Sequence, residues 1–281
     1  MSADLEEDRS PAGRARAEKA LVTLVHRLDN EDIPLIVLGG LLPEVLTEGH
    51  EAGPTHLGTT DVDMLVAAHL DSRVEMVELE RALTATGFKP IPGQGGWRWR
   101  GTIDGIAMKL EFLCDLETER TEALIPLAGC ATLRAMNLRG TGYVTQDWVW
   151  RELTAELEAH GQVRVRARFA GLEGYLLSKS VAARQRGAEK DYYDLVFVLL
   201  YNRAGGPSEA ANQLGSGDLA AHIEPLRSTF QEIRARFFGT SSQGPAGFAS
   251  QSLLVDPSML EPQLRATAVA AVAQFIDALL S

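Results

Sequence analysis

The spacing of hydrophobic residues changes along this chain, and that change restricts the fold more than any other feature. Before residue 120, a helical repeat over 17–28 alternates with the short β-rich runs PLIVLGG and DVDMLVA. The segments WRWRGTI and IAMKLEFL, on either side of Asp104-Gly105, predict a hairpin. From Arg168 onward the repeats are helical. The sequence therefore predicts an α+β fold, in which a mixed β-sheet flanked by helices is followed by a mainly helical C-terminal part.

The length of 281 residues fits two domains of ordinary size. We expect a flexible N-terminus over 1–16, because the first residues are polar and charged and include Pro11 and Gly13. An α/β domain is then expected over 17–150, and a helical C-terminal domain over 151–281.

The charge balance and the cysteines exclude several classes of protein. Lys and Arg number 27 against 38 Asp and Glu, so the formal net charge of −11 argues against a surface that binds nucleic acid all round. Cys114 and Cys130 match neither a zinc site nor a disulfide framework. No apolar run reaches about 18 residues, and the first residues are acidic rather than signal-like. We therefore expect a cytoplasmic protein without a membrane segment.

A pair of aspartates opens the second predicted strand. Because side chains alternate along a strand, Asp61 and Asp63 point to one face, with Cα atoms about 6.6 Å apart, and can share a cation such as Mg²⁺. A solvated strand face is the alternative interpretation. If the strand IAMKLEFL pairs beside this one, Glu111 adds a third carboxylate; Asp115 is the fallback for that position.

A glycine pair marks the end of the first predicted strand. Gly39 and Gly40 allow the backbone to approach a phosphate, although a plain strand-to-helix turn would look the same. The loop HLGTT leads into the D-x-D motif and the apolar run follows it. This order resembles the nucleotidyltransferase superfamily that contains DNA polymerase β, with its pattern of strand, G-[GS], helix and D-h-[DE]-h. In haloacid-dehalogenase-type phosphatases and GT-A glycosyltransferases, the apolar strand comes first.

The second half adds a more specific pattern, L-L-x-K followed by R and then K-D-x-x-D-L. Together with VLGG and T-x-D-h-D, it resembles the AbiEii-type nucleotidyltransferases, which include the MenT toxins of type IV toxin–antitoxin systems. The resemblance covers about residues 34–200. The matching residues are Gly39, Gly40, Thr59, Asp61, Asp63, Lys179, Arg186, Lys190, Asp191 and Asp194.

The resemblance implies that a nucleoside monophosphate is transferred from an NTP to a hydroxyl acceptor with the help of Mg²⁺ or Mn²⁺. Asp61, Asp63 and Glu111 would bind metal, with Glu111 also able to accept the proton of the acceptor. Lys179 would neutralise triphosphate charge, and Asp194 would orient Lys179 or touch the nucleotide. The implied nucleotide-binding residues are Gly39, Gly40, Thr59, Thr60, Lys179, Arg186, Lys190 and Asp191.

The resemblance also implies that the helical domain completes the nucleotide site, that the protein is a toxin with a cognate antitoxin protein, and that tRNA is the acceptor. Between Arg164 and Lys190, seven basic residues against two acids give a local charge of +5. This segment would suit a tRNA backbone or the triphosphate itself.

Two departures from the family pattern keep other functions open. Gly40 stands where the family often has serine, and Leu57 stands where it often has arginine. One alternative is a catalytically inactive nucleotidyltransferase-like module that binds a nucleotide or a protein. Another is an aminoglycoside-type nucleotidyltransferase with a small-molecule acceptor.

Overall fold

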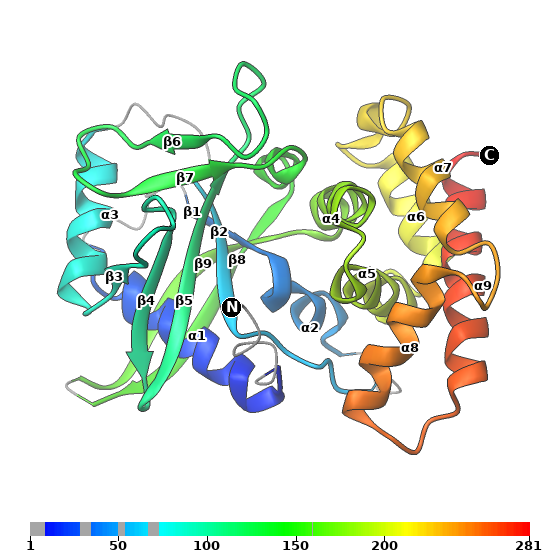
Figure 1. Ribbon diagram of the computed structural model, residues 1–281, viewed down its shortest axis with the longest axis horizontal. Helices are drawn as coiled ribbons and strands as arrows, with labels where there is room; N and C mark the ends of the chain where they lie inside the picture. The colour runs from blue at the N-terminus through cyan, green and yellow to red at the C-terminus, as the bar shows by residue number, and fades with distance from the viewer. Residues whose placement is uncertain (1–8, 29–34, 50–53, 67–72, 159) are drawn as a thin grey trace. The chain divides into compact units, whose positions relative to one another are not determined.

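The computed structural model describes residues 9–28, 35–49, 54–66, 73–158 and 160–281. In these ranges the chain forms one mixed β-sheet of nine strands and nine α-helices (Figure 1). It divides into two compact units. Unit 1 comprises residues 1–41 and 58–170, and unit 2 comprises residues 42–57 and 171–281.

Unit 1 contains the whole sheet. Its main strand order is β3-β4-β5-β2-β1-β9-β8, with β7 pairing β5 and β6. The strand β2 is antiparallel to β1 and parallel to β5, whereas β9 is parallel to β1. The strands are β1 Leu35–Leu38, β2 Asp61–Val66, β3 Lys89–Pro90, β4 Arg98–Ile103, β5 Ile106–Cys114, β6 Leu124–Pro126, β7 Arg134–Asn137, β8 Trp148–Leu157 and β9 Gly161–Ala170.

Two α-helices accompany the sheet of unit 1, α1 (Pro11–Val25) and α3 (Arg73–Ala85). The hydroxyl of Ser10 accepts a hydrogen bond from the backbone N–H of Gly13 and thereby caps α1. Val22 of α1 packs with Leu157 and Val163 of the β8–β9 hairpin. Two short 3₁₀ turns, η1 (Gly39–Leu41) and η2 (Thr141–Thr145), follow β1 and precede β8.

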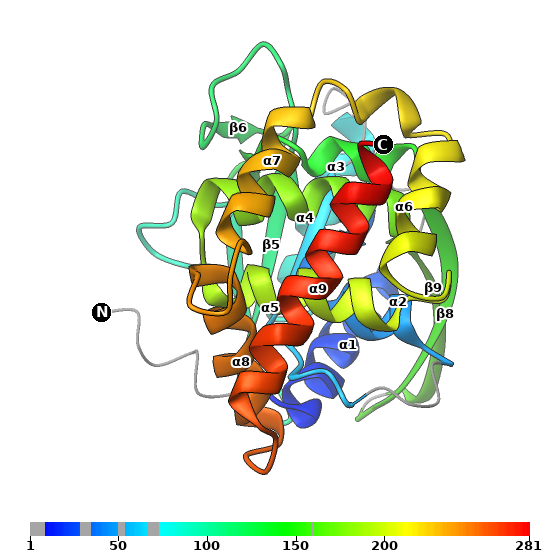
Figure 2. The same ribbon diagram turned by 90° about the vertical axis from the view of Figure 1, so that its right-hand side faces the viewer.

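Unit 2 is helical. In α5, every residue from Asp191 to Leu199 is buried, so this helix forms the core of the unit. Figure 2 shows α9 running alongside α6 and α8, with which it makes contact. The helices are α2 Leu42–Thr47, α4 Leu172–Arg186, α5 Glu189–Tyr201, α6 Pro207–Ser216, η3 Ala220–His222, α7 Arg227–Arg236, α8 Gln243–Val255 and α9 Glu261–Leu279.

The expected combination of a mixed sheet with helices and a helical C-terminal part is confirmed, but the boundaries differ. The hairpin 148–170 belongs to unit 1 rather than to the helical part, because β9 pairs with β1 through Ile36 and Arg168. The N-terminus expected to be flexible over 1–16 is helical from Pro11, while residues 1–8 of that prediction lie outside the described residues. In the described ranges, no helix has the length and apolar character that a membrane crossing requires.

Candidate functional site

The predicted carboxylates meet on one face of the sheet in unit 1. The parallel register of β2 and β5 pairs Asp61 with Lys109 and Asp63 with Glu111. Paired residues in neighbouring strands point to the same face, so the three carboxylates and the Lys109 ammonium share it. The pairing that the Glu111 prediction required is therefore present.

Two cations accompany these carboxylates. The Lys109 Nζ atom lies 3.4 Å from Asp61 Oδ2 and 3.8 Å from Glu111 Oε1, and Arg98 Nε lies 2.9 Å from the same Glu111 oxygen. Burial, and then the charge of Asp61, raise the pKa of Glu111 above its ordinary value, while Arg98 and Lys109 act in the opposite direction. Glu111 is thus protonated more easily than an ordinary glutamate.

The glycine pair is packed tightly against the acidic strand. Gly39 has a φ of +75°, and a Cβ atom added there would overlap the Asp63 carboxylate. A Cβ on Gly40 would overlap the side chain of Thr59. Both glycines therefore allow the end of β1 to approach β2, which gives the turn a structural reason in addition to the predicted phosphate contact.

The threonine of the motif orients an aspartate. Thr59 is buried, and its hydroxyl donates a hydrogen bond to Asp61 Oδ1 over 2.7 Å. The next residue, Thr60, is half-buried. The fallback residue Asp115 accepts hydrogen bonds from the backbone N–H groups of Gly140 and Gly142, so it fastens the loop before η2.

The carboxylates on this face supply only part of the ligand set that a hard cation requires. Asp61 and Asp63 supply only oxygen donors on one face, as Mg²⁺ prefers when phosphates provide further ligands. Glu111 is held by Arg98, and Lys109 lies near both Asp61 and Glu111. Among the described residues, no group of three or more His, Cys, Asp or Glu side chains is arranged to hold a metal ion. The aspartate pair is therefore the part of the set that suits a metal best.

The residues predicted from the second half form a buried ion cluster in unit 2. Lys179 Nζ on α4 lies 2.9 Å from Asp194 Oδ2 and 3.2 Å from Asp191 Oδ1, both on α5. Burial lowers the pKa of Lys179, but Asp194 and Asp191 outweigh it, so the pKa lies above its ordinary value. The ammonium is thus charged and engaged inside the unit. Its contact with a triphosphate stays a prediction.

The other two predicted basic residues are more exposed. The guanidinium of Arg186 reaches back to Asp191 Oδ1 over 2.8 Å, although half of its side chain is exposed. Lys190, at the start of α5, is exposed. Asp191 is fully buried, and its Oδ1 atom forms ion pairs with both Lys179 and Arg186.

A histidine that the sequence analysis did not single out joins this cluster. His56 is buried, and its Nε2 atom lies 3.0 Å from Asp194 Oδ1. The ring stacks on Tyr193 with centroids 5.0 Å apart, and the Tyr193 hydroxyl accepts a hydrogen bond from the backbone N–H of Leu57. The available signal was Asp194 itself, because a carboxylate in an apolar helix requires several partners.

No family model matches the sequence, and no curated protein is detectably similar to it.

Proposed function

We propose that this protein is a Mg²⁺-dependent nucleotidyltransferase that transfers a nucleoside monophosphate from an NTP to a hydroxyl acceptor. The observation that carries the proposal is the register of β2 and β5, which sets Glu111 beside Asp63 on the face that carries Asp61. The backbone of Gly39 packs against Asp63. An acidic cluster beside a glycine turn suits a donor whose phosphates arrive with divalent cations.

Five residues of unit 1 have roles in this proposal. Asp61 and Asp63 would hold Mg²⁺ or Mn²⁺, which would supply positive charge to neutralise the phosphates of the donor. Thr59 keeps Asp61 in place through its hydroxyl. The raised pKa of Glu111 suits a group that accepts the proton of the acceptor hydroxyl, with Arg98 holding the carboxylate in position.

The remaining roles rest on the resemblance to AbiEii-type proteins. In this proposal Lys179, Arg186 and Lys190 bind the triphosphate, while Asp191 and Asp194 orient Lys179 through their ion pairs with it. A tRNA acceptor and a cognate antitoxin protein belong to the same proposal, in which the protein is a toxin.

Release of pyrophosphate from each NTP tests the proposal. With Mg²⁺ and total RNA present, the protein is expected to release pyrophosphate and to label one component. Asp63→Asn should lower the rate about a hundredfold or more, the size of effect seen when a key electrostatic group is lost. Asp104→Asn is the matched control. Asp104 lies in the β4–β5 turn of the same unit, away from the carboxylate group, and its ion pair is with Lys19 of α1. Equal rates for the two variants would contradict the assignment.

A catalytically inactive nucleotide-binding module is the second candidate. It is favoured by the Lys109 ammonium, which already lies within 4 Å of both Asp61 and Glu111 and supplies positive charge among the carboxylates. This candidate predicts that NTP binds in calorimetry while no pyrophosphate appears with any NTP. An aminoglycoside-type enzyme would instead release pyrophosphate only with a small-molecule acceptor and not with RNA.

A further inference from the structure

Two tryptophans and two arginines form a regular arrangement on the β8–β9 hairpin of unit 1. The antiparallel register pairs Trp148 with Ala170 and Trp150 with Arg168, so alternate residues of the two strands share one face. The guanidinium carbon of Arg168 lies 4.9 Å from the ring centroids of Trp148 and Trp150, and that of Arg166 lies 4.8 Å from the Trp150 ring. We call these four residues the Trp–Arg ladder.

Within the ranges that the structure describes, the arginines of the ladder lack the carboxylate partners expected in an acidic protein. The chain carries 38 aspartates and glutamates. Among the described residues, however, neither Arg166 nor Arg168 forms an ion pair, and the buried Nε atom of Arg168 has no hydrogen-bond acceptor. Arg164, on the same face, reaches Glu152 only at 4.0 Å. Two positive charges are thus held in place by aromatic rings and remain available to an anion.

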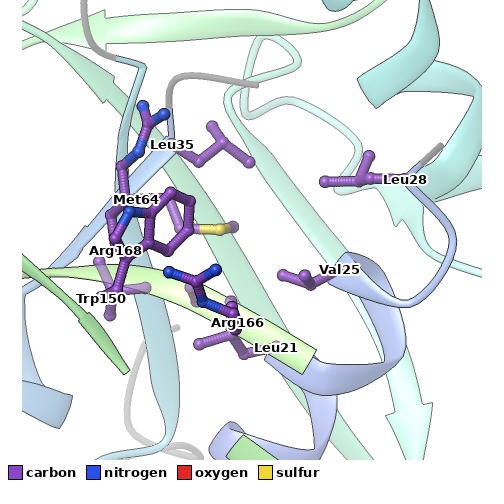
Figure 3. A pocket seen from close by; sticks show the side chains of 10 residues that line it. Leu21, Val25, Leu28, Leu35, Met64, Trp150, Arg166 and Arg168 are labelled. Atoms are coloured by element: carbon purple, nitrogen blue, oxygen red, sulfur yellow. The ribbon is translucent and has the colours of Figure 1, made fainter. Parts of the chain in front are cut away.

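The ladder borders accessible surface. The strand β8 is the last strand of the sheet, and Trp148 is 36% exposed. Beside Trp150 lies a shallow hollow, with Leu21, Val25 and Met64 among its apolar residues. Figure 3 shows the Arg166 and Arg168 guanidinium groups on either side of the Trp150 indole at this hollow. Aromatic faces, apolar surface and unpaired cations therefore occur together.

We propose that the Trp–Arg ladder binds single-stranded nucleic acid, with a base stacking on the partly exposed Trp148 and phosphates contacting Arg166 and Arg168. Unpaired strands expose the flat faces of their bases, whereas a duplex hides them, so an aromatic surface with adjacent arginines selects single strands. The phosphates complement the two arginines, which have no carboxylate partner in the part of the chain that the structure describes. This inference does not depend on the carboxylate site, because none of its residues belongs to that site.

Binding of a labelled oligonucleotide tests the inference without any catalysis. The probe is a fluorescein-labelled 12-nucleotide RNA of mixed sequence, added to the full chain without NTP or divalent metal, and its anisotropy is followed from low to moderate salt. Binding should weaken as salt rises. Arg166→Gln combined with Arg168→Gln should reduce the slope of log K against log salt by about 1.4, which is two contacts at about 0.7 each for single strands.

The tryptophans are tested by a conservative and a non-conservative change. Trp148→Leu should weaken RNA binding at least about fivefold, the lower end for loss of one stacked base, whereas Trp148→Phe should retain most of the affinity. Circular dichroism and thermal melting establish that each variant is folded. Because Trp148 is partly exposed on an outermost strand, these changes leave the core of the unit unaltered.

A matched control removes the same charge elsewhere. Arg227→Gln with Arg265→Gln disrupts two surface ion pairs of unit 2, with Glu224 and Glu261, and should leave RNA binding unchanged. The inference is overturned if the wild-type protein does not bind the RNA, or if the ladder variants bind as the control does. It is also overturned if a duplex of the same sequence binds equally well. Competition by free UTP or inorganic phosphate at the concentration of the oligonucleotide would overturn it too, because it would indicate a mononucleotide or phosphate site.

Discussion

Replacing Lys179 by methionine tests how the buried ion cluster contributes to stability. The substitution shortens the unbranched side chain by one atom and removes the charge that lies 2.9 Å from Asp194 and 3.2 Å from Asp191. Removing one partner from a buried ion pair costs about 3 to 5 kcal/mol, because a buried charge is left uncompensated. Since Asp191 keeps Arg186 and Asp194 keeps His56, we expect the lower end, about 3 kcal/mol.

Urea denaturation and thermal melting measure this loss. At about 2 to 4 °C per kcal/mol, a cost of about 3 kcal/mol lowers the melting temperature of unit 2 by roughly 6 to 12 °C. The double variant Lys179→Met with Asp194→Asn should be more stable than Lys179→Met alone, because it also removes the charge left without its partner. Arg234→Gln, which breaks an exposed pair with Asp277, is the control and should change stability by less than about 1 kcal/mol.

The pH dependence of the same variant follows from the direction of the pKa shift. The pKa of Lys179 is raised in the folded protein, so its stabilising effect is complete at pH values below the ordinary lysine pKa and is lost as the pH rises through the folded value. The difference between wild type and Lys179→Met should therefore stay constant from about pH 7 to 9 and shrink only in stronger alkali. A difference below about 1 kcal/mol at pH 7 would refute the reasoning.

Three further predictions concern unit 1. Gly39→Ala should weaken Mn²⁺ binding in calorimetry and lower the melting temperature, because the positive φ and the overlap with Asp63 force the turn to move; unchanged values would contradict this. In urea titrations between pH 4 and pH 7, the free energy of unfolding of Glu111→Gln should rise relative to that of the wild type as the pH rises. The reason is that the pKa of Glu111 is raised, so ionising this buried carboxyl costs the wild type stability. A difference independent of pH would be inconsistent with this prediction. Burial raises the pKa of Cys114 to about 12 and that of Cys130 to about 11, so a thiol reagent at pH 8 should react slowly before denaturant is added, and prompt labelling of either would refute it.

Some features followed from local sequence alone. The alternation of side chains along a strand placed Asp61 and Asp63 on one face, and the structure shows that strand over Asp61–Val66. The apolar face of IAMKLEFL likewise marked Lys109 and Glu111 as residues of the opposite face. These predictions needed only the period of a strand, which a chain expresses over a few residues.

Two glycines of α8 serve helix packing rather than a turn. The segment 239–251 is rich in glycine and serine, a composition typical of loops, yet α8 begins at Gln243. A side chain at Gly244 would overlap the Phe237 ring, and one at Gly247 would press on Glu189 and Tyr192. Glycine here lets helices approach closely, and composition does not distinguish that use from a turn.

The sequence by itself determined the periods of the elements, the face shared by the two aspartates and the glycine turn before them, because each of these depends on neighbours a few residues away. Only the tertiary structure decided that β9 joins β1, which assigns the hairpin 148–170 to the sheet. It also decided that His56 meets Asp194, 138 residues further along the chain, and that Arg98 and Lys109 accompany Glu111. Contacts between distant segments depend on which strands and helices pack together, and no local pattern of residues records that choice.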